Sequence, residues 1–149
     1  VIVHQTGDSD YKDFERLSER QCDRYLVRKW IDVIDWGYIL ENTTLAVSRA
    51  GANTLTEFAY FSIPSIVIPI PFSNMNEQEK NAEYFHELGL VQKISQKGLT
   101  SQKLLKLVKE CVSDISLLKE KAKNAKSVVI VDASKRVALE TKILGENEN

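Results

Sequence analysis

The segment from Ser48 to Glu57, SRAGANTLTE, contains residue types that could hold an anionic ligand. Ala50, Gly51 and Ala52 are small, so a ligand could approach the backbone closely. The next residues are predicted to begin a helix, whose free N–H groups and aligned peptide dipoles favour an anion such as a diphosphate. Glu57 follows one turn later, where its carboxylate could accept hydrogen bonds from a ribose diol. These parts together predict a nucleotide-diphosphate site.

The same segment also has a purely structural interpretation. Strand, small turn and helix recur throughout α/β folds, and a single AGA lacks the specificity of a complete G-x-G-x-x-G. Glu57 could be a solvated carboxylate on a helix face, or the partner of Arg49. The pattern by itself leaves both interpretations open.

A second polar cluster follows the next apolar run. Pro69 and Pro71 stiffen the loop after that run, and Gln78 and Asn81 stand three apart, side by side on the following helix. Side-chain amides both donate and accept hydrogen bonds, which suits sugar hydroxyls. The alternative is that these amides only cap and solvate the helix. Because both clusters follow strands, they are expected at one edge of a parallel sheet, which favours a ligand site.

Short β-branched runs and helical patterns alternate along the chain. The runs lie at 1–3, 25–27, 45–47, 66–70 and 91–94. The helical patterns lie at 8–21, 54–61, 77–88, 101–112, 114–126 and 132–144. This alternation predicts an α/β, Rossmann-like fold, in which a parallel sheet carries helices on both faces.

Composition restricts the class of protein. The 149 residues are 43% hydrophobic and 28% charged, which fits one globular domain, assigned to 1–145 without an internal boundary. The formal net charge of -1 gives no overall field that would attract nucleic acid, so nucleic acid is not an expected partner. The last residues, ENEN at 146–149, are expected to be disordered.

The cysteines, the length of the apolar runs and the first residues indicate where the protein is located and whether it is a fragment. Cys22 and Cys111 lie far apart and neither belongs to a C-x-x-C pair, which disfavours a disulfide framework or zinc site and favours a reduced, cytosolic setting. No apolar run reaches the roughly 18 residues that cross a bilayer. The chain opens directly on a β-branched run, VIVHQTG, which predicts that it was cut from a longer protein.

Five segments, in chain order, resemble one known family. HQTG, VSRAGANTLTE, SIPSIVIPIPF, NEQEKNAEYFHELGLV and DASKRVALE are similar to the donor-binding C-terminal half of the MurG family. That family comprises two-domain GT-B glycosyltransferases that move N-acetylglucosamine (GlcNAc) from UDP-GlcNAc to lipid I, which gives lipid II in peptidoglycan synthesis. The resemblance covers nearly the whole chain. It implies that 1–145 form the UDP-sugar-binding half of a hexosyltransferase.

The resemblance assigns the diphosphate and ribose contacts residue by residue. It implies that Ala52, Asn53 and Thr54, together with Gly51, contact the diphosphate through backbone and hydroxyl groups. Glu57 matches the family glutamate that binds the ribose hydroxyls. The implied contacts therefore fall on the segment that the residue types single out.

The sugar and base contacts are implied in the same way. Gln78 matches a glutamine of the family's sugar-binding amide pair, and Asn81 matches the asparagine that follows it on the helix. Ile34, in DVIDW, matches the backbone position that reads uracil. The chain departs from the family at 75–77, MNE, where an aspartate and a histidine or glutamine are usual. Contacts to the sugar hydroxyls are therefore less firmly implied than contacts to UDP.

The resemblance also implies what lies outside the chain. A first strand with a phosphate loop, and an N-terminal half with the lipid acceptor site and the catalytic base, are expected to be missing. This chain alone is thus expected to be inactive, and neither His4 nor His86, which lack a partnered nucleophile or carboxylate, is assigned a catalytic role. No metal or cofactor is expected beyond the donor UDP-GlcNAc.

In the full-length protein, the implied acceptor is polyprenyl-linked and the implied location is cytoplasmic, peripheral on the inner face of the cell membrane. Two alternatives stay open. The chain could be the donor domain of another GT-B transferase that uses a UDP-sugar, or a non-catalytic nucleotide-binding α/β module.

Overall fold

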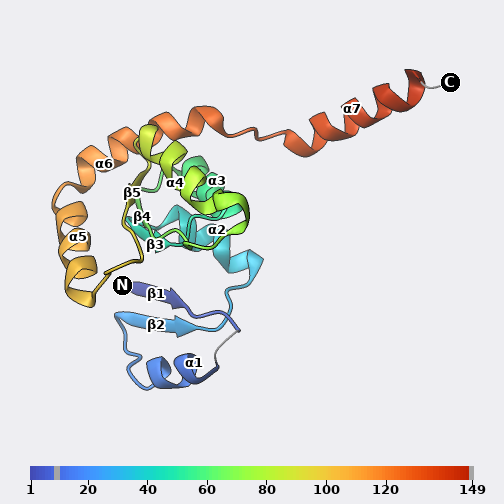
Figure 1. The fold of residues 1–149 in the computed structure, drawn as a ribbon. Helices are drawn as coiled ribbons and strands as arrows, with labels where there is room; N and C mark the ends of the chain where they lie inside the picture. Colours follow the sequence, from blue (N-terminus) through green and yellow to red (C-terminus); the bar gives the residue numbers. More distant parts are fainter. Residues whose placement is uncertain (9–10, 148–149) are drawn as a thin grey trace. The chain divides into compact units, whose positions relative to one another are not determined.

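The computed structural model describes residues 1–8 and 11–147. The chain forms two compact units, Val1–Asn42 and Thr43–Asn149 (Figure 1). The contacts within the chain separate these units after Asn42, and the assignment of one domain to 1–145 stays a prediction. Each unit has its own parallel sheet, and each is described by itself.

The first unit is built on two parallel strands. Its elements are β1 (Ile2–Gln5), α1 (Tyr11–Ser18), β2 (Tyr25–Arg28) and α2 (Val33–Glu41). The register places Val3 opposite Leu26. Val27, Ile31 and Leu40 are at most 9% exposed and form the apolar centre of the unit. Val27 lies on β2, within the run predicted at 25–27, whereas Ile31 lies in the loop after it and Leu40 on α2.

The second unit contains a three-stranded sheet in the order β3-β4-β5, with all strands parallel. Its elements are β3 (Ala46–Ser48), α3 (Ala52–Phe61), β4 (Ser65–Val67), the 3-10 turn η1 (Asn74–Asn76), α4 (Glu77–Glu87), β5 (Val91–Lys93), α5 (Ser101–Ser113), α6 (Ile115–Ala122), the 3-10 segment η2 (Lys123–Val128) and α7 (Ala133–Asn147). Figure 1 shows α3 and α4 on one side of this sheet and α5 and α6 on the other.

The central strand explains why this sheet needs both helical layers. Ser65, Ile66 and Val67 of β4 are each at most 1% exposed, so side chains on both faces of the strand are buried. A strand buried on both faces is expected to be a continuous apolar run, and SIVI is such a run. Leu55 and Phe58 of α3, at 0% and 3% exposure, contribute to the buried core.

Helix α4 begins at Glu77, where the predicted helical pattern at 77–88 also begins. The pattern places Asn76 as the N-cap, and Asn76 does hold that position, but its backbone is left-handed (φ 58°) and its side chain makes no capping hydrogen bond. Instead, Ser73 Oγ accepts a hydrogen bond from Gln78 N at 3.2 Å. Met75 is also left-handed (φ 49°), so the chain turns sharply before the helix and brings Ser73 within reach of it.

The C-terminal ends of α4 and α7 differ in how well they match the sequence prediction. Gly89 ends the α4 segment with φ 79°, and a Cβ there would stand 3.1 Å from the Cβ of Lys121, so both backbone angle and space favour glycine. Helix α7 runs to Asn147, past the predicted end at Gly145, and overlaps the first two residues of the predicted disordered tail. Residues 148 and 149 lie outside the described residues, where disorder stays a prediction.

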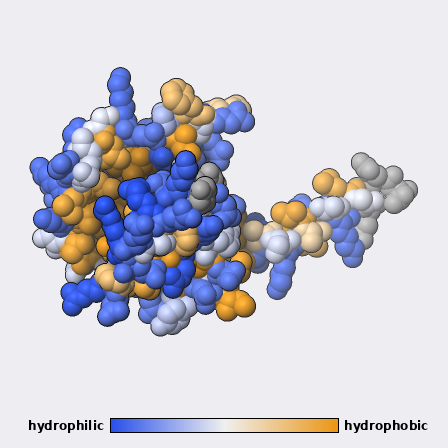
Figure 2. All heavy atoms as spheres, turned by 90° about the horizontal axis from the view of Figure 1, so that it is seen from below, coloured by the Kyte–Doolittle hydropathy of each residue, from blue (hydrophilic) through white to orange (hydrophobic). Residues whose placement is uncertain are grey.

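The predicted α/β class with parallel strands is confirmed. The strands divide over two sheets instead of one, however, and the missing first strand stays a prediction. Figure 2 shows one face of the molecule, where hydrophilic residues predominate and hydrophobic ones are interspersed. Among the described residues, no helix is both long and apolar enough to cross a bilayer.

Candidate functional site

The carboxyl ends of β3, β4 and β5 meet at one edge of the second unit because the three strands are parallel. Arg49, directly after β3, donates from Nη1 to the carbonyl oxygen of Ile68 at 3.0 Å and to Gln96 Oε1 at 2.7 Å. Ile68 directly follows β4, and Gln96 lies in the loop after β5. One exposed side chain therefore joins the loops that follow all three strands.

The first turn of α3 begins at this edge. Its N-cap is Gly51, which has extended backbone (φ -70°, ψ 140°) and no capping side chain, and the first intrahelical bond runs from Leu55 N to Gly51 O at 3.0 Å. The N–H groups of Ala52, Asn53 and Thr54 precede that bond and have no acceptor inside the helix. Ala52 and Asn53 are exposed and Thr54 is half-buried. The structure thus brings the four predicted diphosphate residues together in one turn that suits an anion.

Gly51 leaves room beside this turn. Its φ is accessible to any residue, and a Cβ built there would meet no atom within 4 Å. Neither backbone strain nor crowding from the chain therefore requires glycine at this position. The open space on that side is available to a bound group.

Glu57 lies on α3, half-buried, three residues after Thr54. Residues three apart share one side of a helix, so its carboxylate lies on the same side as Thr54. Its position is compatible with the predicted ribose contact, which stays a prediction.

The two predicted sugar-binding amides of α4 lie against the turn before α3. Gln78 Oε1 accepts from the backbone N–H of Ala50 at 3.3 Å and of Ile70 at 3.0 Å. Asn81 Nδ2 donates to the carbonyl oxygen of Ala50 at 3.1 Å. The structure therefore brings both amides to the same edge as α3, where backbone groups are their partners.

The segment before α4 carries the departure from the family pattern. Met75 and Glu77 are exposed, and Met75 and Asn76 are two consecutive non-glycine residues with left-handed backbone. Such residues occur mostly where the surroundings hold them in place. The bond from Gln78 N to Ser73 Oγ provides such a constraint.

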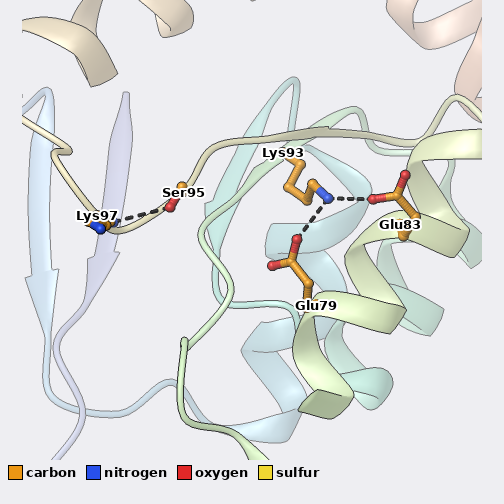
Figure 3. A network of polar contacts seen from close by, with 5 residues as sticks. All are labelled: Glu79, Glu83, Lys93, Ser95 and Lys97. Carbon is orange, nitrogen blue, oxygen red and sulfur yellow. Dashed lines mark hydrogen bonds and ion pairs between the residues drawn. The ribbon is translucent and has the colours of Figure 1, made fainter.

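An ion-pair cluster fastens α4 to β5 (Figure 3). Lys93 Nζ contacts Glu79 Oε1 at 2.8 Å and also Glu83 Oε2. The hydrogen bond and positive charge of Lys93 lower the pKa of Glu83, and the hydrogen bonds that Lys93 donates to Glu79 and Glu83 raise the pKa of Lys93. Since the groups are largely exposed, the cluster orients the helix and contributes little stability.

Ile34, the residue predicted to contact uracil, belongs to the first unit. It is on α2 in the first unit, 91% exposed. Its contact with uracil stays a prediction. A hollow of about 420 Å³ in the first unit is lined by Arg28, Trp30, Asp32, Asp35, Tyr38 and Ile39, among others, and not by Ile34.

The two histidines have structural contacts. His4 Nδ1 bonds to the hydroxyl of Tyr25 at 2.8 Å, between β1 and β2. His86 Nδ1 contacts the carbonyl oxygen of Val91 at 2.9 Å, between the end of α4 and β5. That neither histidine is a catalytic base stays a prediction.

Sequence reasoning missed the joining roles of Arg49, Gln96 and Ser73. Arg49 lies next to the predicted site in the sequence, directly after a predicted strand, and this position could have indicated a role at the edge of the sheet. Gln96 and Ser73 gave no comparable signal, because only the fold brings their loops to Arg49 and to α4.

A parallel α/β unit with an anion-suited helix start at its carboxyl edge is the architecture of a nucleotide-binding domain. Residues 1–137 match the family model described as glycosyltransferase family 28 C-terminal domain, and the chain belongs to this family. It is thus the C-terminal domain of a glycosyltransferase.

Three curated relatives carry the name UDP-N-acetylglucosamine--N-acetylmuramyl-(pentapeptide) pyrophosphoryl-undecaprenol N-acetylglucosamine transferase. Those of Halothermothrix orenii and Crocosphaera subtropica are each 33% identical, over 84% and 92% of this chain and 35% and 38% of their own length. That of Finegoldia magna is 33% identical over 99% of this chain and 39% of its own length. The chain therefore spans well under half of these relatives.

Solved structures agree on the fold. MurG of Acinetobacter baumannii matches with a TM-score of 0.73 and 24% identity, over 91% of this chain and 39% of that one. The kitacinnamycin glycosyltransferase matches with a TM-score of 0.66 and 24% identity, over 84% of this chain and 30% of that one. The glycosyltransferase VinC, solved in complex with DTDP, matches with a TM-score of 0.63 and 18% identity, over 76% of this chain and 27% of that one.

Proposed function

We propose that this chain is the domain that binds UDP-GlcNAc in an inverting transferase, which moves GlcNAc to lipid I to form lipid II in peptidoglycan synthesis. The main support is the one-third identity, over most of the chain, to relatives whose name states this donor and a pyrophosphoryl-undecaprenol acceptor. The acceptor half, its base and a peripheral site on the cytoplasmic face of the membrane belong to the proposed full-length protein.

The α3 turn provides the proposed diphosphate contacts. The N–H groups of Ala52, Asn53 and Thr54 point from a helix start, where partial positive charge favours phosphate oxygens. The hydroxyl of Thr54 adds a donor, and Glu57 on the same side of α3 accepts from the ribose hydroxyls. In this proposal Ile34 supplies the uracil contact, and Gln78 and Asn81 lie beside the sugar.

The proposed reaction is one displacement. The 4-hydroxyl of the acceptor sugar attacks the anomeric carbon of GlcNAc and loses its proton to a base outside this chain. The bond from that carbon to the diphosphate oxygen breaks, its electron pair leaves with UDP, and the anomeric configuration inverts. The α3 N–H groups stabilise the charge that grows on the leaving diphosphate. That no metal is needed stays a prediction.

Calorimetric titration of the 149-residue chain tests the proposal. The ligands are UDP-GlcNAc, UDP, GDP, dTDP and NAD, and we expect heats of binding for the two uridine ligands at concentrations where the others give none. Equal affinity for UDP and GDP, or tighter binding of NAD, would contradict a UDP-sugar site and favour a general nucleotide-binding module.

One substitution removes a single phosphate donor without disturbing the helix. Ala52 is the first helical residue and Gly51 before it is extended, so Ala52→Pro deletes one N–H at a position that proline tolerates. UDP affinity should fall by about 1.5–3 kcal/mol, the contribution of one hydrogen bond to a charged group. Ser101→Pro, at the same position of α5, is the matched control and should leave the affinity unchanged.

The segment 75–77 favours a second candidate with a different sugar. Glu77 is exposed in the first turn of α4, at a position where the resemblance leads us to expect a histidine or glutamine. A carboxylate only accepts hydrogen bonds, so it suits a different pattern of sugar hydroxyls. Titration with UDP-glucose and UDP-galactose distinguishes the candidates, because binding of either one tighter than UDP-GlcNAc would favour another UDP-sugar transferase.

A further inference from the structure

The side-chain amides of Gln78 and Asn81 bond to both backbone polar groups of one residue, Ala50. Gln78 Oε1 accepts from Ala50 N at 3.3 Å, and Asn81 Nδ2 donates to Ala50 O at 3.1 Å. Ala50 itself is 0% exposed, so without the amides its polar backbone groups would be shielded from water and unpaired. Burial of such groups without a partner is unfavourable, which makes these two contacts important for the turn.

The same oxygen of Gln78 reaches a second loop. It also accepts from Ile70 N at 3.0 Å, in the loop after β4. One atom on α4 therefore holds both the turn after β3 and the loop after β4. Its own helix start is held in turn by Ser73, from the same loop, through the bond to Gln78 N.

Ala50 lies directly before the turn that carries the proposed phosphate donors. Ala50 is followed by Gly51, the N-cap of α3, and then by the N–H groups of 52–54. Any rotation of the Ala50 peptide would reorient Gly51 and so the first turn. Arg49, on the other side of Ala50, is fixed to Ile68 and Gln96.

We propose that Gln78 and Asn81 are positioning residues for the diphosphate turn, which act through the backbone of Ala50 and not chiefly through contact with the sugar. The inference rests on the proposed function of the α3 turn. Their amide groups keep the first-turn N–H groups of α3 preoriented toward the phosphates, so the binding of UDP without any sugar depends on them.

The first test needs no ligand. Amide hydrogen exchange measured by NMR on the 149-residue chain should show that Gln78→Met, which has no acceptor oxygen, exposes the Ala50 and Ile70 amides to exchange about tenfold faster. Gln78→Glu keeps an acceptor oxygen and should restore slow exchange. The Ser65 amide, bonded to Leu90 O at 3.0 Å in the sheet, serves as reference and should not change.

The second test separates a positioning residue from a sugar ligand. Titration of Asn81→Ala should show UDP and UDP-GlcNAc weakened by the same factor, about tenfold, because both need the turn. A sugar ligand would lower the affinity of UDP-GlcNAc alone. Asn124→Ala and Gln102→Met, at exposed helix positions outside the network, are the matched controls for the two substitutions.

Each outcome decides the inference. Unchanged exchange at Ala50 and Ile70 in Gln78→Met, or a loss confined to UDP-GlcNAc in Asn81→Ala, would overturn it. Faster exchange that extends to Ser65 would show loss of the whole unit and would also count against a local role. If the unsubstituted chain binds no uridine ligand, the proposed function fails. The hydrogen-exchange rates of the Ala50 and Ile70 amides then decide by themselves whether Gln78 holds the turn.

Discussion

The two parallel sheets of this chain end their strands in different ways. After β1, the backbone ladder continues, with Thr6 N bonded to Arg28 O at 2.9 Å and Gly7 N bonded to Lys29 O at 3.0 Å. After β3, the ladder ends with the bond from Ile68 N to Ser48 O at 2.9 Å. Beyond that point, side chains hold the loops of the second unit.

The difference has a functional consequence. An edge held by its own backbone uses its N–H and C=O groups for structure, so few are left for a ligand. An edge held by side chains can turn directly into a helix whose first N–H groups have no internal partner. The start of α3 in the second unit therefore suits an anion, and Arg49, Gln78 and Asn81 hold the loops beside it.

The largest effect should come from the core beneath the side-chain-held edge. Leu55, at 0% exposure, anchors the first turns of α3, so Leu55→Ala should destabilise the chain by about 2–5 kcal/mol. Urea unfolding followed by circular dichroism measures this. Leu105→Ala, at an exposed position of α5, is the control, and an equal midpoint for both variants would show that α3 is not anchored there.

Removal of the proposed ribose acceptor should have the next largest effect. Glu57→Ala should weaken UDP-GlcNAc binding by about 1.5–3 kcal/mol, because a carboxylate that accepts from hydroxyls makes a charge-assisted bond. Calorimetry measures the affinity, and Glu87→Ala, at the exposed end of α4, is the control. Unchanged affinity in Glu57→Ala would contradict the ribose contact and favour a structural role for Glu57, as a solvated carboxylate or a partner of Arg49.

A substitution at Gly51 should change the affinity for UDP with little change in the stability of the fold. Gly51→Ala introduces a Cβ that meets no atom within 4 Å, so stability should change by about 1 kcal/mol or less, mainly because alanine is a poor N-cap. The same methyl group occupies space beside the proposed phosphate site, so UDP affinity should fall. Thermal unfolding and titration of the same sample check both; a large stability loss with unchanged affinity would contradict this role.

The ion-pair cluster of α4 and β5 should have the smallest effect. Lys93→Met removes both contacts seen in Figure 3, and the thermal midpoint should fall slightly at low salt and converge with that of the unsubstituted chain at high salt. A difference that persists in high salt would indicate a packing role for the lysine stem instead.

The pH dependence of the same pair has a definite sign. The pKa of Glu83 is lowered in the fold, so its contribution is present above its unfolded pKa and is lost as pH falls through the folded value. The pKa of Lys93 is raised, so its contribution is present below its unfolded pKa and is lost as pH rises through the folded value. The difference between Lys93→Met and the unsubstituted chain should therefore be largest near neutral pH and shrink at both extremes.

Local signals gave the elements of the second unit correctly. Hydrophobic period and β-branched runs predicted the strands and helices, and small residues before a helix predicted the first turn of α3. These features depend on neighbours in sequence. The gathering of Gly51, Ala52, Asn53 and Thr54 follows from one such local segment, which is why the sequence alone could identify it.

Features that depend on partners distant in sequence were not predicted. The division of strands between two sheets depends on which edges pair, and no run of residues states its partner. Asn76 holds the N-cap position of α4, but with a left-handed backbone its side chain makes no capping hydrogen bond, and Ser73 Oγ accepts from Gln78 N instead. The amides of Gln78 and Asn81 suggested hydroxyl ligands by chemistry, whereas their observed partners include Ala50, 28 and 31 residues away in sequence.

The two thiols give this chain a built-in contrast for labelling. Cys22, in the first unit, is exposed, whereas Cys111 on α5 is buried, which raises its pKa and keeps it protonated. Because the thiolate is the reactive form, a maleimide dye at neutral pH should attach to Cys22 and leave Cys111 unmodified. Slow modification of Cys111 would then time the opening of the second unit, and its slowing by UDP would report ligand binding without any engineered probe.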